Sequence, residues 1–248
     1  MSALLELNAI SLKLQSMDHP ILSDIHYRVL PHDFIIVLGS NGSGKSSLLK
    51  LMDQRYTASS GKIFLHGKSI EKFSNQDFSK KIITLTQNCH DSLFVSLTVL
   101  DNYLLVKQRH ESKIFSIRQR KEREFFANYL QEFNPNLSLK LDQVVEKLSG
   151  GEKQALALAL SVLYPPEILL LDEHTSALDP KSAQQLMALT HRVVTDHKIT
   201  CILTTHDLDI AMQYGNRILA LKHGKIFKCY DHSEKNALSQ TELLAGCY

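Results

Sequence analysis

The hydrophobic and polar positions of this chain alternate between strand-like and helix-like patterns. The predicted strands near the amino terminus lie at about 4–14, 25–30, 34–39 and 62–66. The later predicted strands lie at 168–172, 199–204 and 218–222, and the predicted helices between them at 181–196 and 207–213. Strands that alternate with helices in this way predict an α/β fold with a parallel sheet.

The middle of the chain has a different pattern. Residues 88–163 contain few β-branched strand segments and are expected to be helical. The chain shows neither low-complexity linkers nor an internal repeat. We therefore expect a single domain, 1–248, in which residues 1–87 and 164–248 form the α/β core and residues 88–163 form an inserted helical subdomain.

Composition adds little about partners but restricts the class of protein. The 248 residues are 44% hydrophobic and 22% charged, and the formal charge of +2 gives no bias toward nucleic acid or an anionic surface. The four cysteines are scattered, without a CxxC pair, which is typical of a reduced, cytosolic protein. The start resembles a strand rather than a signal peptide, and no apolar run approaches the ~18 to 20 residues of a membrane helix. If the protein works at a membrane, another protein is expected to span it.

The segment GSNGSGKS, residues 39–46, matches the phosphate-loop pattern G-x-x-x-x-G-K-[ST] between a strand-like and a helical segment. The glycines let the backbone N–H groups and the helix N-terminus face phosphates. Lys45 is expected to reach the β and γ oxygens, and the Ser46 hydroxyl to bind Mg²⁺. The predicted nucleotide-binding residues of this loop are Gly39, Ser40, Asn41, Gly42, Ser43, Gly44, Lys45, Ser46 and Ser47.

The apolar run 168–171 ends in adjacent carboxylates, Asp172 and Glu173. A strand buried on both faces excludes unpaired charges, so both side chains are expected at the strand's exit, beside the phosphate loop. There Asp172 is expected to hold Mg²⁺, and Glu173 to orient and deprotonate the attacking water.

The segment LSGGEKQALALAL, residues 148–160, narrows the choice among phosphate-loop enzymes. Together with the loop at 39–46, Gln87, LLLDE at 169–173, SALD at 176–179 and TTHD around His206, it resembles the ATP-binding cassette family, the nucleotide-binding subunits of ABC transporters. The resemblance covers nearly the whole chain. It implies the P-loop ABC-ATPase fold, with a mainly parallel core sheet, an N-terminal antiparallel β subdomain and the inserted helical subdomain.

The resemblance also assigns roles to residues outside the phosphate loop. Free N–H groups at a helix start form an anion site. In the family, the corresponding residues bind the γ-phosphate of ATP held by a second copy, so two copies enclose two ATP molecules head to tail. The residues that match this site are Ser149, Gly150, Gly151 and Glu152. Gln87 is expected to sense Mg²⁺ and the attacking water, His206 to contact the γ-phosphate, and Asp179 to connect the two sites across the dimer.

The implied function is an ATPase motor that drives a separate integral membrane permease from the cytoplasmic face of the membrane. Uptake of a small solute is the leading interpretation, with amino acids as one candidate class and a substrate-binding protein as an indirect partner. The stretch DEHTSALD is similar to a bacterial importer subgroup that works with a TrpX-like substrate-binding protein. The alternatives are a soluble ABC-type ATPase acting on nucleic acid or ribosomes, and the motor of a lipid or lipoprotein export system. Nucleic acid is not expected as a partner, because the chain lacks a second cassette and long heptad segments.

Four positions depart from the family pattern. Ala155 and Leu160 stand in the segment 148–160 at positions that are often arginine in the family. His174 replaces the proline that usually follows the catalytic glutamate, and we expect it to be a tolerated loop residue. Leu14, followed by Gln15–Met17, occupies the place of the aromatic residue that usually stacks on adenine.

The basic stretch 107–124 has two interpretations. It is either a solvated helix face with opposite charges at helical spacing, or part of the surface that docks the permease, together with apolar residues of 92–105. Arg118 and Arg120 are the residues proposed for testing the second interpretation.

Overall fold

The computed structural model describes residues 2–14, 18–111, 119–237 and 242–243. The chain divides into two compact units. Unit 1 comprises Met1–Thr84, Pro166–Glu173 and Val194–Tyr248. Unit 2 comprises Leu85–Pro165 and His174–Val193. The assignment of 88–163 as an inserted subdomain stays a prediction.

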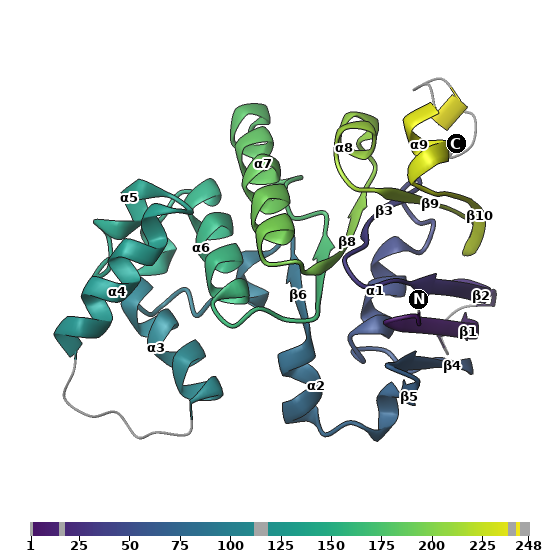
Figure 1. Ribbon diagram of the computed structural model, residues 1–248, viewed down its shortest axis with the longest axis horizontal. Helices are drawn as coiled ribbons and strands as arrows, with labels where there is room; N and C mark the ends of the chain where they lie inside the picture. The colour runs from purple at the N-terminus through teal and green to yellow at the C-terminus, as the bar shows by residue number, and fades with distance from the viewer. Residues whose placement is uncertain (1, 15–17, 112–118, 238–241, 244–248) are drawn as a thin grey trace. The chain divides into compact units, whose positions relative to one another are not determined.

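Unit 1 is built on a six-stranded sheet with the strand order β10-β9-β3-β8-β7-β6 (Figure 1). Its strands are β3 (Phe34–Leu38), β6 (Ile82–Thr86), β7 (Ile168–Asp172), β8 (Thr200–Thr205), β9 (Arg217–Lys222) and β10 (Lys225–Tyr230). The central strand β3 is parallel to both β8 and β9, and β7 is parallel to β8. Residues of β3 and β8 are all buried, as expected for parallel strands covered on both faces.

The second sheet of unit 1 is antiparallel, in the order β2-β1-β4-β5. Its strands are β1 (Leu5–Leu12), β2 (Leu22–Val29), β4 (Ser60–Leu65) and β5 (Lys68–Ser69). In β2, buried and more exposed residues alternate, which fits a sheet with one packed face.

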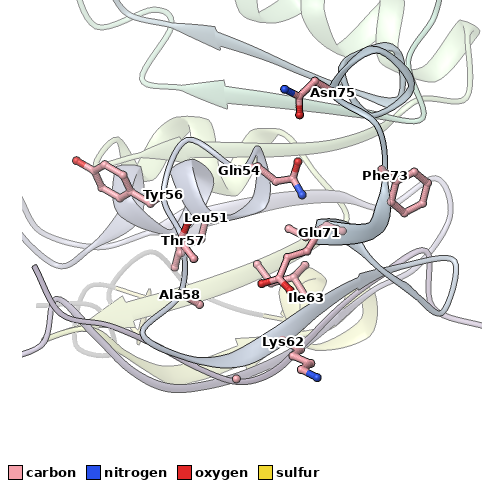
Figure 2. A pocket seen from close by; sticks show the side chains of 12 residues that line it. Leu51, Gln54, Tyr56, Thr57, Ala58, Lys62, Ile63, Glu71, Phe73 and Asn75 are labelled. Carbon is pink, nitrogen blue, oxygen red and sulfur yellow. The ribbon is translucent and has the colours of Figure 1, made fainter.

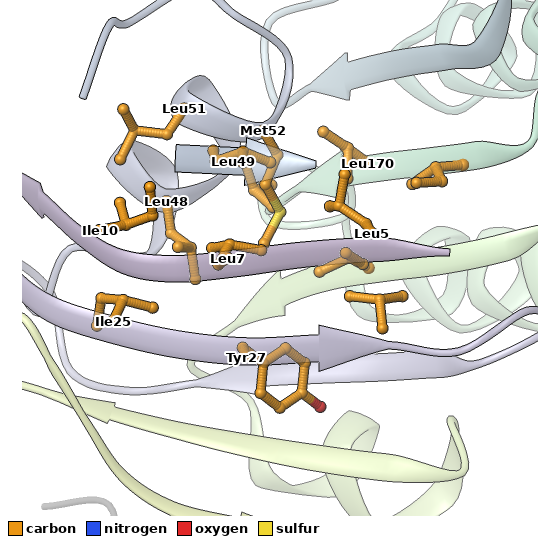
Figure 3. Packing of buried hydrophobic residues seen from close by; sticks show 14 of the residues in the cluster. Leu5, Leu7, Ile10, Ile25, Tyr27, Leu48, Leu49, Leu51, Met52 and Leu170 are labelled. Atoms are coloured by element: carbon orange, nitrogen blue, oxygen red, sulfur yellow. The ribbon is translucent and has the colours of Figure 1, made fainter. Parts of the chain in front are cut away.

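The helices of unit 1 include α1, which follows the phosphate loop directly. Their bounds are α1 (Lys45–Met52), α2 (Asn75–Lys81), α8 (Leu208–Gln213) and α9 (His232–Ala237). Leu48, Leu49, Leu51 and Met52 of α1 are buried in the apolar core. Figure 3 shows these side chains beside Leu5, Leu7 and Ile10 of β1, Ile25 and Tyr27 of β2, and Leu170 of β7. Packing of α1 against this cluster fixes the end of the phosphate loop.

Unit 2 is helical in its described part. Its helices are α3 (Val99–His110), α4 (Gln119–Gln131), α5 (Pro135–Ser138), α6 (Gly150–Val162) and most of α7 (Pro180–Asp196). Reciprocal hydrogen bonds between Thr98 and Asp101 begin α3, and the same kind of capping box begins α6. Among the described residues, no helix combines the length and the apolarity that a crossing of the bilayer requires.

The predicted α/β fold with a mainly parallel sheet and an N-terminal antiparallel sheet is confirmed. The sequence pattern missed α2, α9, β5, β6 and β10. β10 is an edge strand with mostly exposed side chains, so its sequence lacks the apolar pattern of a buried strand.

Candidate functional site

The predicted phosphate loop connects the carboxyl end of β3 to α1 in unit 1. Gly42 and Gly44 have φ angles of 80° and 106°, which residues with a Cβ rarely adopt. A Cβ on Gly44 would also lie 2.8 Å from a methyl group of Leu22. The loop conformation therefore depends on glycine at these positions, as the sequence pattern predicts.

The side chain of Lys45 is enclosed by the phosphate loop. Its side chain is 5% exposed, and its Nζ donates hydrogen bonds to the carbonyl oxygens of Gly39 (2.8 Å) and Ser40 (3.2 Å). The same Nζ lies 3.5 Å from Glu173 Oε1. The positive charge is thus held between the loop and the carboxylate that follows β7.

Asp172 and Glu173, called the DE pair below, lie at the carboxyl end of β7, as predicted. The Ser46 hydroxyl donates to Asp172 Oδ1 at 2.9 Å, and Thr204 donates to the same oxygen at 2.7 Å. Glu173 Oε1 lies 3.5 Å from His206 Nδ1. The structure therefore brings Lys45, Ser46, Asp172, Glu173 and His206 together.

Strand order explains how residues this distant in sequence meet. β8 lies between β3 and β7, and Leu38 pairs with Thr205 while Asp172 pairs with Thr204. The three parallel strands therefore end at nearly the same level, and the loops that follow them are neighbours. This is the edge at which open α/β sheets bind ligands.

The residues present fit a magnesium nucleotide. A serine hydroxyl and a carboxylate are the hard oxygen ligands that Mg²⁺ prefers. The Ser43 hydroxyl is buried in the loop and has no hydrogen-bond partner among the described residues. The glycine-rich backbone and Lys45 supply donors for phosphate oxygens.

The remaining predicted residues belong to unit 2. Ser149 caps the N-terminus of α6, and its N–H donates to Glu152 Oε2 at 3.0 Å. Ser149 and Gly150 are exposed, so this helix start is open to solvent. Partial burial raises the pKa of Glu152, but hydrogen bonds from Lys140 and Ser149 outweigh this effect and hold the pKa below its ordinary value.

Gln87 follows β6 and has an exposed side chain. Its carbonyl oxygen accepts a hydrogen bond from the Gln154 side chain at 3.1 Å, which connects this segment to α6. Asp179 is exposed and accepts from Ser182 N–H at 3.1 Å, directly before Pro180 begins α7. Hydrogen bonds from Ser182 lower the pKa of Asp179.

His174 lies in the loop between β7 and α7, as expected, but its side chain is buried. It is 1% exposed, its Nε2 lies 3.2 Å from Thr190 Oγ1, and its Nδ1 has no partner among the described residues. The Thr190 hydroxyl donates its proton to the Leu186 carbonyl oxygen, so it accepts from His174, and His174 Nε2 is the protonated ring nitrogen. Burial lowers the pKa of His174 to about 4, and the ring is neutral at pH 7.

Leu14 is partly buried against the apolar core cluster, and Gln15–Met17 lie outside the described residues. A separate surface pocket of about 280 Å³ lies in unit 1, with Tyr56 and Phe73 at opposite ends of the view in Figure 2. Its lining contains none of the predicted site residues.

The basic stretch 107–124 is partly neutralised by its own glutamates. Lys107 pairs with Glu122 at 2.7 Å, and Arg120 pairs with Glu124 at 3.1 Å, while Arg118 lies outside the described residues. These pairs agree with the first interpretation of the stretch. Of the apolar residues in 92–105, Leu93, Val99 and Tyr103 are buried, whereas Phe94 is 62% and Leu105 38% exposed.

Thr204 of unit 1 and Gln154 of unit 2 contact predicted site residues and were not predicted from the sequence. Both are polar residues in apolar segments, and that contrast is the signal that the sequence offered.

Comparison with solved structures supports the fold. The structure of cbiO1 from Clostridium perfringens, part of the ABC transporter complex cbiONQ, has a TM-score of 0.81 at 23% identity and covers 99% of this chain and 95% of its own. A dimeric ATP-binding cassette in a post-hydrolysis state, bound to ADP and phosphate, has a TM-score of 0.76 at 23% identity, covering 92% and 98%. The P-loop ABC-ATPase fold is confirmed.

Sequence comparisons define the family. Residues 22–176 match the family described as ABC transporter. The chain is 33% identical to a tyrosine transport ATP-binding protein of Clostridioides difficile, over 86% of this chain and 84% of that protein. It is 32% identical to the methionine import ATP-binding protein MetN of Chlamydia pneumoniae, over 84% of this chain and 60% of the longer MetN. The family match and the identity over most of the chain show that it belongs to the ABC transporter family, as one of its ATP-binding and ATP-hydrolysing components.

Proposed function

We propose that this chain is the motor subunit of an ABC importer, which closes as a head-to-tail dimer around two ATP molecules and drives a separate membrane permease. One observation supports this proposal most strongly. Lys45, Ser46, Asp172, Glu173 and His206 lie together at the carboxyl ends of adjacent parallel strands. This arrangement combines phosphate binding, a magnesium site and a base for the attacking water.

Each residue of the cluster has a distinct role in the proposal. Backbone N–H groups of 39–47 and the Lys45 ammonium bind the β- and γ-phosphates. Ser46 and Asp172, together with Gln87 from outside the cluster, would hold Mg²⁺, which would neutralise the charge that develops on the phosphate oxygens. Glu173 orients the water and accepts its proton, and His206, whose Nδ1 lies 3.5 Å from Glu173, contacts the γ-phosphate.

The dimer completes each nucleotide site. The start of α6 presents exposed Ser149 and Gly150, and the N–H groups of this turn lack helical partners. In the proposal, Ser149, Gly150, Gly151 and Glu152 bind the ATP held by the second copy, and Asp179 links the two sites. The dimeric state of the solved post-hydrolysis cassette supports this arrangement.

The transported class is inferred from relatives. Their names specify tyrosine transport, methionine import and phosphonates import. Uptake of an amino acid or a similarly small solute is therefore the proposed role, with the subunit peripheral at the cytoplasmic face of the membrane. A TrpX-like substrate-binding protein, reached only through the permease, is the proposed indirect partner.

The catalytic assignment is tested with Glu173→Gln. This variant should bind ATP like the wild type but hydrolyse it ~10² to 10⁴-fold more slowly, because it lacks the base. It should also accumulate as an ATP-bound dimer in size-exclusion chromatography. Glu71→Gln, at an exposed position of unit 1, is the matched control and should retain full turnover. Wild-type hydrolysis by Glu173→Gln would remove Glu173 from the mechanism.

The partner is tested by purifying the tagged chain from its native membranes in mild detergent and identifying co-purifying proteins by mass spectrometry. Recovery of a polytopic membrane protein is the expected result. Recovery of ribosomes or nucleic-acid enzymes instead would contradict the transport role while leaving the ATP chemistry intact.

A further inference from the structure

The side chain of Thr204 contacts both residues of the DE pair. Its hydroxyl donates to Asp172 Oδ1 at 2.7 Å and accepts a hydrogen bond from the Glu173 N–H at 3.2 Å. A hydroxyl has one proton and two lone pairs, so it can make both bonds at once. Thr204 is 0% exposed, and water therefore cannot substitute for it.

The backbone of Glu173 needs such support. Its φ angle of 48° lies in the left-handed region, which costs a residue with a Cβ roughly 1 to 2 kcal/mol. The Glu173 N–H also lies 3.3 Å from the Thr204 carbonyl oxygen, so Thr204 holds this amide from its main chain and its side chain. These contacts oppose relaxation of Glu173 into an ordinary extended or helical conformation.

The hydrogen bond from Thr204 to Asp172 bears on the proposed Mg²⁺ site. Asp172 Oδ1 also accepts from Ser46, whose hydroxyl oxygen is a proposed Mg²⁺ ligand. Thr204 contacts the same carboxylate from the paired position of the neighbouring strand, and its hydroxyl is not a proposed Mg²⁺ ligand. Partners of this kind orient a metal ligand, and their loss typically weakens metal binding ~10 to 100-fold.

We propose that Thr204 is a positioning residue, which orients the Asp172 carboxylate toward Mg²⁺ and fixes the main chain of Glu173. The inference rests on the proposed function, since it assigns Asp172 to the metal and Glu173 to water. Thr204 itself touches neither ATP nor Mg²⁺ in this role.

The test replaces the hydroxyl while keeping the shape. In Thr204→Val a methyl group takes the place of the hydroxyl, whereas Thr204→Ser retains the hydroxyl. Thr200→Val is the matched control, because Thr200 is a 1% exposed threonine of the same strand whose hydroxyl accepts from the His32 N–H at 2.9 Å. Thr204→Ala also lacks the hydroxyl and serves the test if the valine variant does not fold.

Two measurements separate metal positioning from general stability. Calorimetric titration of the purified full-length chain gives the ATP affinity in EDTA and the Mg²⁺ concentration that half-maximally strengthens ATP binding. Thr204→Val should leave the affinity in EDTA unchanged and raise the half-saturating Mg²⁺ concentration ~10 to 100-fold. Thr204→Ser should respond to Mg²⁺ like the wild type, and Thr200→Val should lose stability without any change in the response.

Three results would overturn the proposed role of Thr204. A wild-type Mg²⁺ response in Thr204→Val would overturn the proposal, and so would an equal shift in Thr204→Ser or in Thr200→Val. Failure of the wild-type chain to bind ATP even in EDTA is a different outcome, because it removes the proposed function together with this inference.

Discussion

The turn between β9 and β10 supports the phosphate loop, and this contact yields a sharp prediction. The Gly224 N–H donates to the Ser43 carbonyl oxygen at 3.1 Å, and the Gly224 carbonyl oxygen accepts from the Ser23 N–H at 2.9 Å. A Cβ on Gly224 would lie only 2.2 Å from the Ile21 carbonyl oxygen. Gly224→Ala should therefore push the turn away from the loop.

A second glycine provides the matched control. Gly67 and Gly224 both have a φ angle of 73°, but a Cβ on Gly67 would have nothing within 4 Å. Gly67→Ala thus carries the backbone strain alone, roughly 1 to 2 kcal/mol. Gly224→Ala adds a displacement of roughly 1 Å to restore van der Waals contact. It also weakens two hydrogen bonds, each worth about 0.5 to 1.5 kcal/mol.

The structure therefore predicts that Gly224→Ala loses ~1 to 3 kcal/mol more free energy of unfolding than Gly67→Ala, measured by urea denaturation. Because the displaced turn no longer holds the Ser43 carbonyl, the Kd for ATP should rise ~10-fold in Gly224→Ala, equivalent to ~1.4 kcal/mol, and stay unchanged in Gly67→Ala. Equal stability and equal ATP affinity in the two variants would refute the idea that this turn supports the loop.

Two further substitutions test buried polar groups. His174→Ala should cost ~2 to 4 kcal/mol of unfolding free energy, because it leaves a cavity and removes the hydrogen-bond donor to Thr190. His174→Gln keeps a donor and should cost less. Equal losses of the two variants in urea denaturation would contradict a role for this hydrogen bond. Lys235 is 5% exposed and donates to the carbonyl oxygens of Tyr214 and Gly215, and burial lowers its pKa from 10.5 to about 8. Between these values the unfolded chain binds the proton more tightly, so the stability contributed by this group rises with pH. The free energy of unfolding of the wild type, relative to that of Lys235→Met, should therefore rise by up to ~3 kcal/mol from pH 8 to 10.5. A difference that stays constant with pH would contradict the lowered pKa of Lys235.

The sequence predicted the parts of the fold that depend on local patterns. The phosphate loop was readable because glycine spacing, Lys45 and the flanking strand and helix are all contiguous. The strand at 168–172 was readable because an apolar run ended in two acids. β6 was missed because its ITLT segment is short and lies between polar residues.

The environment of side chains was less predictable. His174 lies in a loop as expected, but its burial against Thr190, 16 residues later in the sequence, was not predicted. Thr204 meets Asp172 across 32 residues. Neither pair has a sequence pattern, because the first depends on how a loop packs against α7 and the second on strand pairing.

Strand pairing sets which residues of β8 reach the candidate site. Successive side chains of a strand point to opposite faces, so a slip of one residue would place Leu203 or Thr205 opposite Asp172 in place of Thr204. With the observed register, Asp172 pairs with Thr204 and Leu38 pairs with Thr205, which aligns the phosphate loop, the DE pair and His206 at one edge. A shifted β8 would remove the Thr204 hydroxyl from Asp172 and move His206 relative to Glu173. The chemistry at this edge therefore depends on the same backbone hydrogen bonds that stabilise the sheet.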